Sequence, residues 1–139
     1  MTFRNGGLAP VLLVDDNVVN QLVVRETARK LGYEAHTVAS GREALLALAR
    51  SPYCAVLMDC QMPGMDGYET TRLLRESGIN SRTPVIALTG GASPSDRVRC
   101  LAAGMNDYVT KPVSRQALEM VLSRWCLEVD AADDTLTTR

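Results

Sequence analysis

Four short apolar runs most constrain how this chain can fold: VLLV, AVLM, PVIAL and DYVT. They are built mainly from Val, Leu and Ile, and each is followed by a segment with helical character. Runs without polar alternation are typical of parallel strands that are buried on both faces. With one further short segment they predict five strands, at Pro10–Asp15, Glu34–Val38, Cys54–Asp59, Thr83–Thr89 and Asp107–Thr110.

Helices are predicted between these strands from their capping and stop signals. They are expected from Asn17 to about Leu31, Ser40 to about Arg50, Tyr68 to Glu76, Ser93 to Gly104, and Pro112 to Cys126. Strands that alternate with helices imply right-handed crossovers and an α/β doubly wound parallel sheet with helices on both faces. For five strands we expect the flavodoxin-like order 2-1-3-4-5, which places the switch point between the first and third strands.

The length of 139 residues fits one domain with a substantial core. Residues 1–9 are polar and contain glycine, so they are expected to form a flexible leader. Residues 128–139 show no apolar periodicity and are expected to form a flexible tail. The body between them, residues 10–127, has no internal repeat and no linker.

The composition argues against several classes of partner. A formal net charge of −1 gives no electrostatic basis for nucleic-acid binding, and one Phe and one Trp provide no platform for stacking bases. No apolar stretch has the length of a membrane span, and two aspartates end the first apolar run, so it is not a signal peptide. We therefore expect no contact with nucleic acid or membrane, and a cytoplasmic location.

The cysteines give no sign of a metal site. They lie at Cys54, Cys60, Cys100 and Cys126. There is no CxxC pair and His36 is the only histidine, so zinc binding is not indicated, and we assign His36 no role. Scattered thiols fit a reducing cytoplasm better than a disulfide framework. Cys60 is expected in the core, because strand alternation points its side chain away from that of Asp59, and a free cysteine packs as a small hydrophobic residue.

Polar residues stand where the apolar runs end: Asp15, Asp16, Asp59, Thr89 and Lys111. The carboxyl ends of parallel strands gather at one edge of a sheet. Three carboxylates packed there would repel one another, and Mg²⁺ would relieve this repulsion. The pattern predicts a site for a divalent cation and a phosphoryl group. Each residue also has an ordinary alternative: paired aspartates form turns, threonine often ends strands, and lysine is usually solvated.

The segments LLVDDN, LMDCQMPGMDGYE, VIALTGGA and AAGMNDYVTKPV resemble the receiver domain of two-component response regulators. They are most similar to receivers fused to hybrid sensor histidine kinases, and the resemblance spans roughly Pro10 to Cys126. It implies that Asp59 accepts a phosphoryl group from phosphohistidine and slowly loses it to water. The chain would thus catalyse only its own phosphorylation and dephosphorylation, with no separate substrate.

The resemblance also assigns the other site residues. Asp16 and Asp59 would bind Mg²⁺ directly, Asp15 through water, and Gln61 through its backbone carbonyl. Thr89 and Lys111 would hold the phosphoryl oxygens, with a cis peptide between Lys111 and Pro112. Tyr108 would be the switch aromatic, which follows Thr89 inward and alters the surface of the fourth helix, fifth strand and fifth helix. Many relatives have Ala-Asn where this chain has Gly90-Gly91.

A docking site for the phosphodonor is expected on the first helix. Its buried face is expected to contain Asn20, Val24, Thr27, Ala28 and Leu31. Val18 and Leu22 would then lie outside this face and near the acidic residues, where they could contact a histidine kinase or histidine phosphotransfer protein. Isolated exposed apolar residues are common, so these two could also have no partner.

Two other functions stay open at this point. A phosphatase of the haloacid-dehalogenase type also uses an aspartate nucleophile and Mg²⁺, but it needs a second acid two residues after the first, where this chain has Asn17. A pseudo-receiver that binds without phosphorylation would be expected to lack one of the acids or Lys111. The chain could be a single-domain regulator or part of a longer hybrid kinase.

Overall fold

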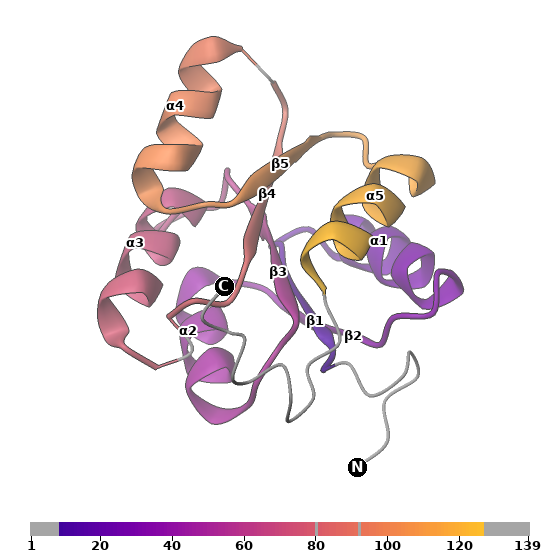
Figure 1. Ribbon diagram of the computed structural model, residues 1–139, viewed down its shortest axis with the longest axis horizontal. Coiled ribbons are helices and arrows are strands. Elements are labelled where there is room, and N and C mark those ends of the chain that lie inside the picture. The colour runs from indigo at the N-terminus through magenta and orange to yellow at the C-terminus, as the bar shows by residue number, and fades with distance from the viewer. Residues whose placement is uncertain (1–8, 80, 92, 127–139) are drawn as a thin grey trace.

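The computed structural model describes residues 9–79, 81–91 and 93–126, and Figure 1 shows their arrangement. Strands and helices alternate along this whole range. In order they are β1 (Val11–Val14), α1 (Val18–Lys30), β2 (Ala35–Val38), α2 (Gly41–Arg50), β3 (Ala55–Asp59), α3 (Gly67–Ser77), β4 (Val85–Thr89), α4 (Pro94–Ala103), β5 (Asp107–Thr110) and α5 (Arg115–Trp125). The expected leader and tail lie almost wholly outside the described residues.

The five strands form one parallel sheet in the order β2-β1-β3-β4-β5, which confirms the predicted topology. Val14 of β1 is paired with Met58 of β3, and Asp59 is paired with Leu88 of β4. Thr89 in turn is paired with Thr110 of β5. This register brings the carboxyl ends of β1, β3, β4 and β5 to one edge of the sheet.

The sheet is covered on both faces, as Figure 1 shows. Every residue of β1, β3 and β4 is buried, which explains why their sequences lack polar alternation. One face packs against α2, α3 and α4 through side chains such as Leu48, Leu74 and Cys100. The other packs against α1 and α5 through side chains such as Val24 and Leu122. These two apolar layers hold the strand ends in place.

Local capping explains most helix boundaries. Side chains of Asn17, Ser40 and Ser93 accept backbone hydrogen bonds at the starts of α1, α2 and α4, as predicted. The predicted start of the last helix at Pro112 is wrong. Ser114 caps α5 by accepting from the amide of Ala117, so Pro112 lies in the preceding loop.

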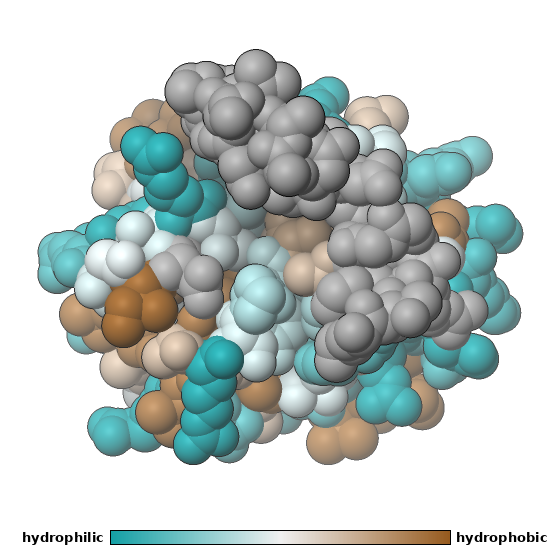
Figure 2. All heavy atoms as spheres, turned by 60° about the horizontal axis from the view of Figure 1, so that its bottom comes forward, coloured by the Kyte–Doolittle hydropathy of each residue, from teal (hydrophilic) through white to brown (hydrophobic). Residues whose placement is uncertain are grey.

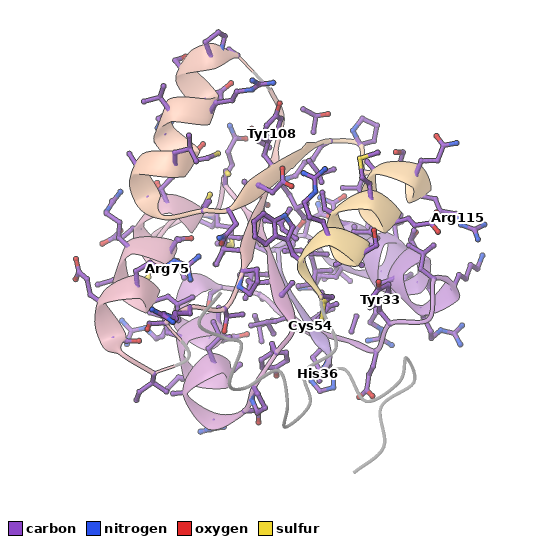
Figure 3. The ribbon with its side chains drawn as sticks, viewed as in Figure 1. Tyr33, His36, Cys54, Arg75, Tyr108 and Arg115 are labelled. Atoms are coloured by element: carbon purple, nitrogen blue, oxygen red, sulfur yellow. A yellow bond between two sulfur atoms is a disulfide. The ribbon has the colours of Figure 1, made fainter. Side chains whose placement is uncertain are left out.

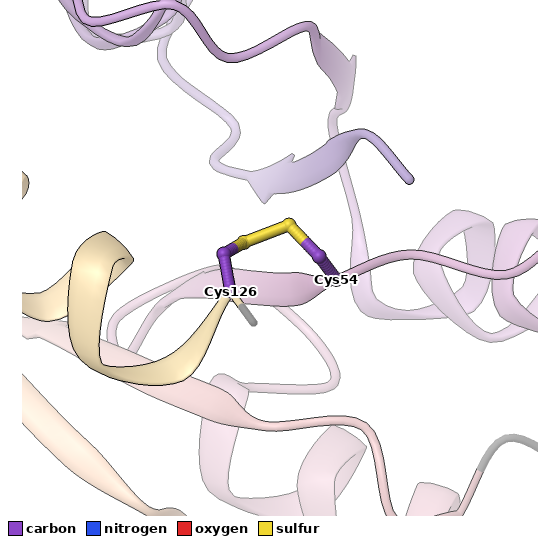
Figure 4. Close-up of a disulfide and its surroundings, with 2 residues drawn as sticks. All are labelled: Cys54 and Cys126. Atoms are coloured by element: carbon purple, nitrogen blue, oxygen red, sulfur yellow. A yellow bond between two sulfur atoms is a disulfide. The ribbon is translucent and has the colours of Figure 1, made fainter. Parts of the chain in front are cut away.

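A disulfide joins Cys54, just before β3, to Cys126 at the end of α5 (Figures 3 and 4). The expectation that the chain carries only free thiols is therefore wrong for this pair. The two residues are 72 positions apart, and their Cα atoms are 4.8 Å apart because α5 folds back over the start of β3. The other two cysteines, Cys60 and Cys100, are free and buried, and Cys60 belongs to the core as predicted.

The surface mixes polar and apolar side chains. On the face in Figure 2, the coloured hydrophobic residues lie scattered among hydrophilic ones. None of the helices in the described ranges is long and apolar enough to cross a membrane.

Candidate functional site

Three carboxylates meet at the carboxyl edge of the sheet. Asp15 and Asp16 follow β1, and Asp59 is the last residue of the neighbouring strand β3. One carboxylate oxygen from each can be chosen so that all three lie within 4.8 Å of one another. Asp15 and Asp59 are 1% and 3% exposed, whereas Asp16 is open to solvent. The structure thus brings together the three acids that the sequence predicted to meet.

Local backbone contacts fix the position of Asp59. The amide of Gln61 donates to Asp59 Oδ1 at 3.0 Å, and the amide of Cys60 donates to the carbonyl of Leu88 at 3.1 Å. Gly67 begins α3 directly against this turn, where an added Cβ would collide with the backbone carbonyl of Asp59. Only glycine permits this close approach of α3 to the strand end.

Lys111 reaches the same carboxylate from the end of β5. Its Nζ lies 2.8 Å from Asp59 Oδ1, and the lysine side chain is 30% exposed while that of Asp59 is 4% exposed. The backbone amide of Lys111 donates to the carbonyl of Thr89 at 2.8 Å, which ties this loop to β4. The peptide bond between Lys111 and Pro112 is cis. The ammonium group therefore forms its hydrogen bond with Oδ1 of Asp59.

The acidic cluster has the character of a cation site. Burial raises the pKa of Asp15, and the neighbouring charge of Asp59 raises this pKa further, although a hydrogen bond from the Asn17 amide opposes the shift. Among the residues that the structure describes, no group hydrogen-bonds to the buried Asp15 Oδ2. Buried polar atoms are normally paired, so an unpaired oxygen beside two further carboxylates fits a ligand position for a cation or its water. Hard oxygen ligands of this kind suit Mg²⁺.

Within the described residues, Thr89 and Tyr108 form no hydrogen bond with the three acids. Thr89 Oγ1 donates to the carbonyl of Gly91 at 2.9 Å and accepts from the Gly91 amide at 3.2 Å. Tyr108 is half-buried, and its Oη accepts from Nε of Arg97 at 2.9 Å. The Thr89 hydroxyl is therefore engaged within its own loop, and the Tyr108 ring is engaged with α4.

Two supporting contacts escaped the sequence reasoning. Gln21 Nε2 donates to the carbonyls of Asp15 at 2.6 Å and Val38 at 3.4 Å, so it bridges the ends of β1 and β2 beside the acids. Arg97 holds the hydroxyl of Tyr108. No sequence spacing marks either contact, because each depends on how a helix packs against the sheet.

An open cleft of about 630 Å³ adjoins the site between the loops that follow β3 and β4. Its lining is mainly polar and includes Gln61, Thr89, Gly91, Asp96 and Arg99. On the other side, the first turns of α1 expose four apolar side chains. They are Val18 (74% exposed), Val19 (67%), Leu22 (57%) and Val23 (53%). The acids therefore lie between a polar cleft and an apolar helix surface.

Comparison with known proteins identifies the class that this fold and site define. Residues 11–123 match the family model of the response regulator receiver domain. The match covers most of the chain and all five strands, and the chain belongs to this family.

Three relatives illustrate the likeness. The hybrid signal transduction protein dokA of Dictyostelium discoideum is 40% identical over 116 residues, which are 83% of this chain and 7% of that protein. The receiver domain of sensor histidine kinase PA1611 from Pseudomonas aeruginosa is 47% identical, with a TM-score of 0.78 over 85% of this chain and 97% of that domain. Its crystal structure has a magnesium ion coordinated in the active-site cleft.

The third relative was solved as a complex. The receiver domain of Saccharomyces cerevisiae Ssk1, crystallised with the histidine phosphotransfer protein Ypd1, is 28% identical with a TM-score of 0.77, over 86% of this chain and 90% of that one. This chain spans only 7% to 13% of the length of the first curated relatives it matches, which include several hybrid kinases.

Proposed function

We propose that this receiver accepts a phosphoryl group from a phosphohistidine onto Asp59. The contact between Lys111 Nζ and Asp59 Oδ1, inside a cluster of three carboxylates, carries the proposal. A lone ion pair could be structural. A buried carboxylate that has a cation on one oxygen and two further acids beside it is suited to receive a highly charged group.

The transfer uses the carboxylate as a nucleophile. Oδ1 is engaged by Lys111 and by the Gln61 amide, so Oδ2 is the oxygen that attacks phosphorus. A new oxygen–phosphorus bond forms, the nitrogen–phosphorus bond breaks, and its electron pair stays on the imidazole of the donor. In hydrolysis, water attacks phosphorus and loses a proton to solvent, the bond between phosphorus and Oδ2 breaks, and phosphate leaves while the electron pair of that bond restores the carboxylate. Lys111 balances the negative charge that develops on the phosphoryl oxygens.

Mg²⁺ would be held by the carboxylates of Asp16 and Asp59, by Asp15 through water, and by the backbone carbonyl of Gln61. The unpaired oxygen of Asp15 supports this ligand set, as does the magnesium ion in the PA1611 receiver. When bound, the ion would neutralise the acids and the incoming phosphoryl oxygens.

The phosphorylated state would be read through Thr89 and Tyr108. The Thr89 hydroxyl would leave the carbonyl of Gly91 and donate to a phosphoryl oxygen, which frees space for the Tyr108 ring to turn inward. The surface formed by α4, β5 and α5 would change in consequence. Gly90 and Gly91 carry no side chain that hinders this movement of the loop.

The donor would be a histidine kinase or a histidine phosphotransfer protein. The exposed apolar side chains of Val18 and Leu22, extended by Val19 and Val23, offer a docking surface beside Asp16. The complex of the related Ssk1 receiver with Ypd1 supports this class of partner. The hybrid kinases among the relatives favour a place for this receiver in a longer hybrid kinase.

A phosphatase of the haloacid-dehalogenase type fits less well. Asn17 takes the position of its second acid, and the Asn17 side chain instead caps α1 by accepting from the Asn20 amide. A pseudo-receiver is disfavoured because all three acids and Lys111 are present at one edge.

Intact mass spectrometry after incubation with acetyl phosphate and Mg²⁺ tests the proposal. The wild type should gain one phosphoryl group, and Asp59→Asn should gain none. Asp66→Asn is the matched control, because Asp66 is a half-buried helix cap whose role asparagine can take over. Equal labelling of wild type and Asp59→Asn would refute the assignment.

A further inference from the structure

Arg97 of α4 contacts the Tyr108 side chain in two ways, through its hydroxyl and through the face of its ring. Nε of Arg97 donates to Tyr108 Oη at 2.9 Å, and the guanidinium carbon lies 5.2 Å from the ring centroid. Figure 3 shows Tyr108 on the side of β5 toward α4, whereas Arg115 lies at the far end of α5. The contact therefore spans two elements of the surface that the proposed switch would change.

Arg97 makes no other side-chain hydrogen bond within the described ranges. Beside the ring lies a hollow of about 160 Å³ between α4 and β5, whose lining includes Cys100, Leu101 and Met105. The ring packs partly against the core and borders this hollow. The contact with Arg97 is a polar interaction that favours its present orientation.

We infer that Arg97 is a positioning residue that holds Tyr108 outward and so opposes the switch. The inference rests on the proposed function, because it takes the inward ring to be the phosphorylated arrangement. A ring that turns inward loses both contacts with Arg97, so the guanidinium lowers the population of the inward state. One hydrogen bond and one weak cation–π contact bias such an equilibrium by about 3- to 10-fold.

Binding of beryllofluoride with Mg²⁺, which stands in for the phosphoryl group, measures this bias. A ligand that prefers the inward state binds more tightly when that state is more populated. Arg97→Ala should lower the half-saturating concentration of beryllofluoride by about 3- to 10-fold. Arg115→Ala is the control, because it removes the same charge from an exposed position on α5 and should change little.

A double-mutant cycle with Tyr108→Phe separates the contact from a general effect of charge. Phenylalanine has no hydroxyl to accept from Arg97 but keeps the ring face, so in this background Arg97→Ala should have a smaller effect on the half-saturating concentration than in the wild type, limited to the cation–π contribution. The inference is overturned if the full effect persists in Tyr108→Phe, or if Arg115→Ala has an equal effect.

The methyl resonance of Thr89 in the free protein provides a readout that needs no phosphoryl analogue. An aromatic ring that turns toward Thr89 shifts this methyl by its ring current, and Thr89 has no direct contact with Arg97 among its hydrogen bonds. Arg97→Ala should move the signal and Arg115→Ala should not. If no variant binds beryllofluoride, the proposed function fails while this shift still tests the inference. An unmoved Thr89 methyl in Arg97→Ala overturns the inference.

Discussion

At the scale of single residues, the site places three carboxylates close together beside one lysine ammonium group, that of Lys111. Asp15 is buried beside Asp59, and its Oδ2 has no hydrogen-bond partner in the part of the chain that the structure describes, so its charged form is poorly solvated. Lys111 contacts Asp59 directly, whereas the pKa of Asp15 is raised, mainly by burial. Functional sites often keep such destabilising groups because activity needs them.

Asp15→Asn should therefore stabilise the metal-free protein while it weakens Mg²⁺ binding. The amide removes a buried charge and can still accept from the Asn17 amide, which Asp15 Oδ1 does at 2.9 Å. We expect a gain of about 1 kcal/mol in the free energy of unfolding at neutral pH, measured by urea titration without Mg²⁺. Asp16→Asn, at an exposed position, should change stability little. A lower stability of Asp15→Asn would contradict this account.

At the scale of elements, Arg75 of α3 anchors the C-terminal end of α4. Its guanidinium donates to the carbonyls of Ser81, Thr83 and Gly104 and to Oδ1 of Asn106, at 2.7 to 2.9 Å. Gly104 ends α4 at a φ of +99°, and an added Cβ would lie 2.9 Å from Arg75 Cγ. One end of α4 is thus tied to the body of the domain, whereas the other adjoins the glycine-containing loop after Thr89.

Arg75→Lys should destabilise the protein although it keeps the charge. Lysine cannot reach four separate oxygens with one ammonium group, so some half-buried carbonyls lose their donors. We expect a loss of about 1–3 kcal/mol in the free energy of unfolding, with faster hydrogen exchange at Met105 and Asn106. Arg72→Lys, an exposed substitution on the same helix, is the control. Equal stability of the two variants would show that the network contributes little.

At the scale of the whole molecule, the disulfide between Cys54 and Cys126 joins the start of the central strand β3 to the end of the last helix. The end of α5 is also held by Trp125 Nε1, which donates to Oδ2 of Asp107 at 2.9 Å. The crosslink restrains the chain across 72 residues, and such constraints act mainly on the unfolded state.

Reduction should therefore lower stability without unfolding the domain. We expect dithiothreitol to reduce the free energy of unfolding by about 2–4 kcal/mol in the wild type. The double variant Cys54→Ser/Cys126→Ser should start at the lower value and not respond to the reductant. Thiol titration of the unfolded, unreduced wild type should count the two free cysteines, Cys60 and Cys100. A count of four would disprove the crosslink.

Local sequence patterns were sufficient for much of the fold and the acidic site. The buried strands lack polar alternation, the caps at Asn17, Ser40 and Ser93 follow from side-chain type, and a parallel sheet must gather its carboxyl ends at one edge. For that reason Asp15, Asp16 and Asp59 could be placed together before any coordinates were known. The start of α5 was misplaced because Pro112 and Ser114 both suit a helix start, and only the capping hydrogen bond distinguishes them.

Sequence patterns are enough to predict the order of strands and helices, the edge of the sheet where the acids lie, and the family of the chain. Which side chains touch across the molecule follows only from the folded structure. Cys54 meets Cys126, Arg97 meets Tyr108, and the Thr89 hydroxyl turns to Gly91. The physical reason is one of range. Strand periodicity and caps depend on neighbouring residues, whereas these contacts depend on helix packing and side-chain rotamers, which no spacing along the chain encodes.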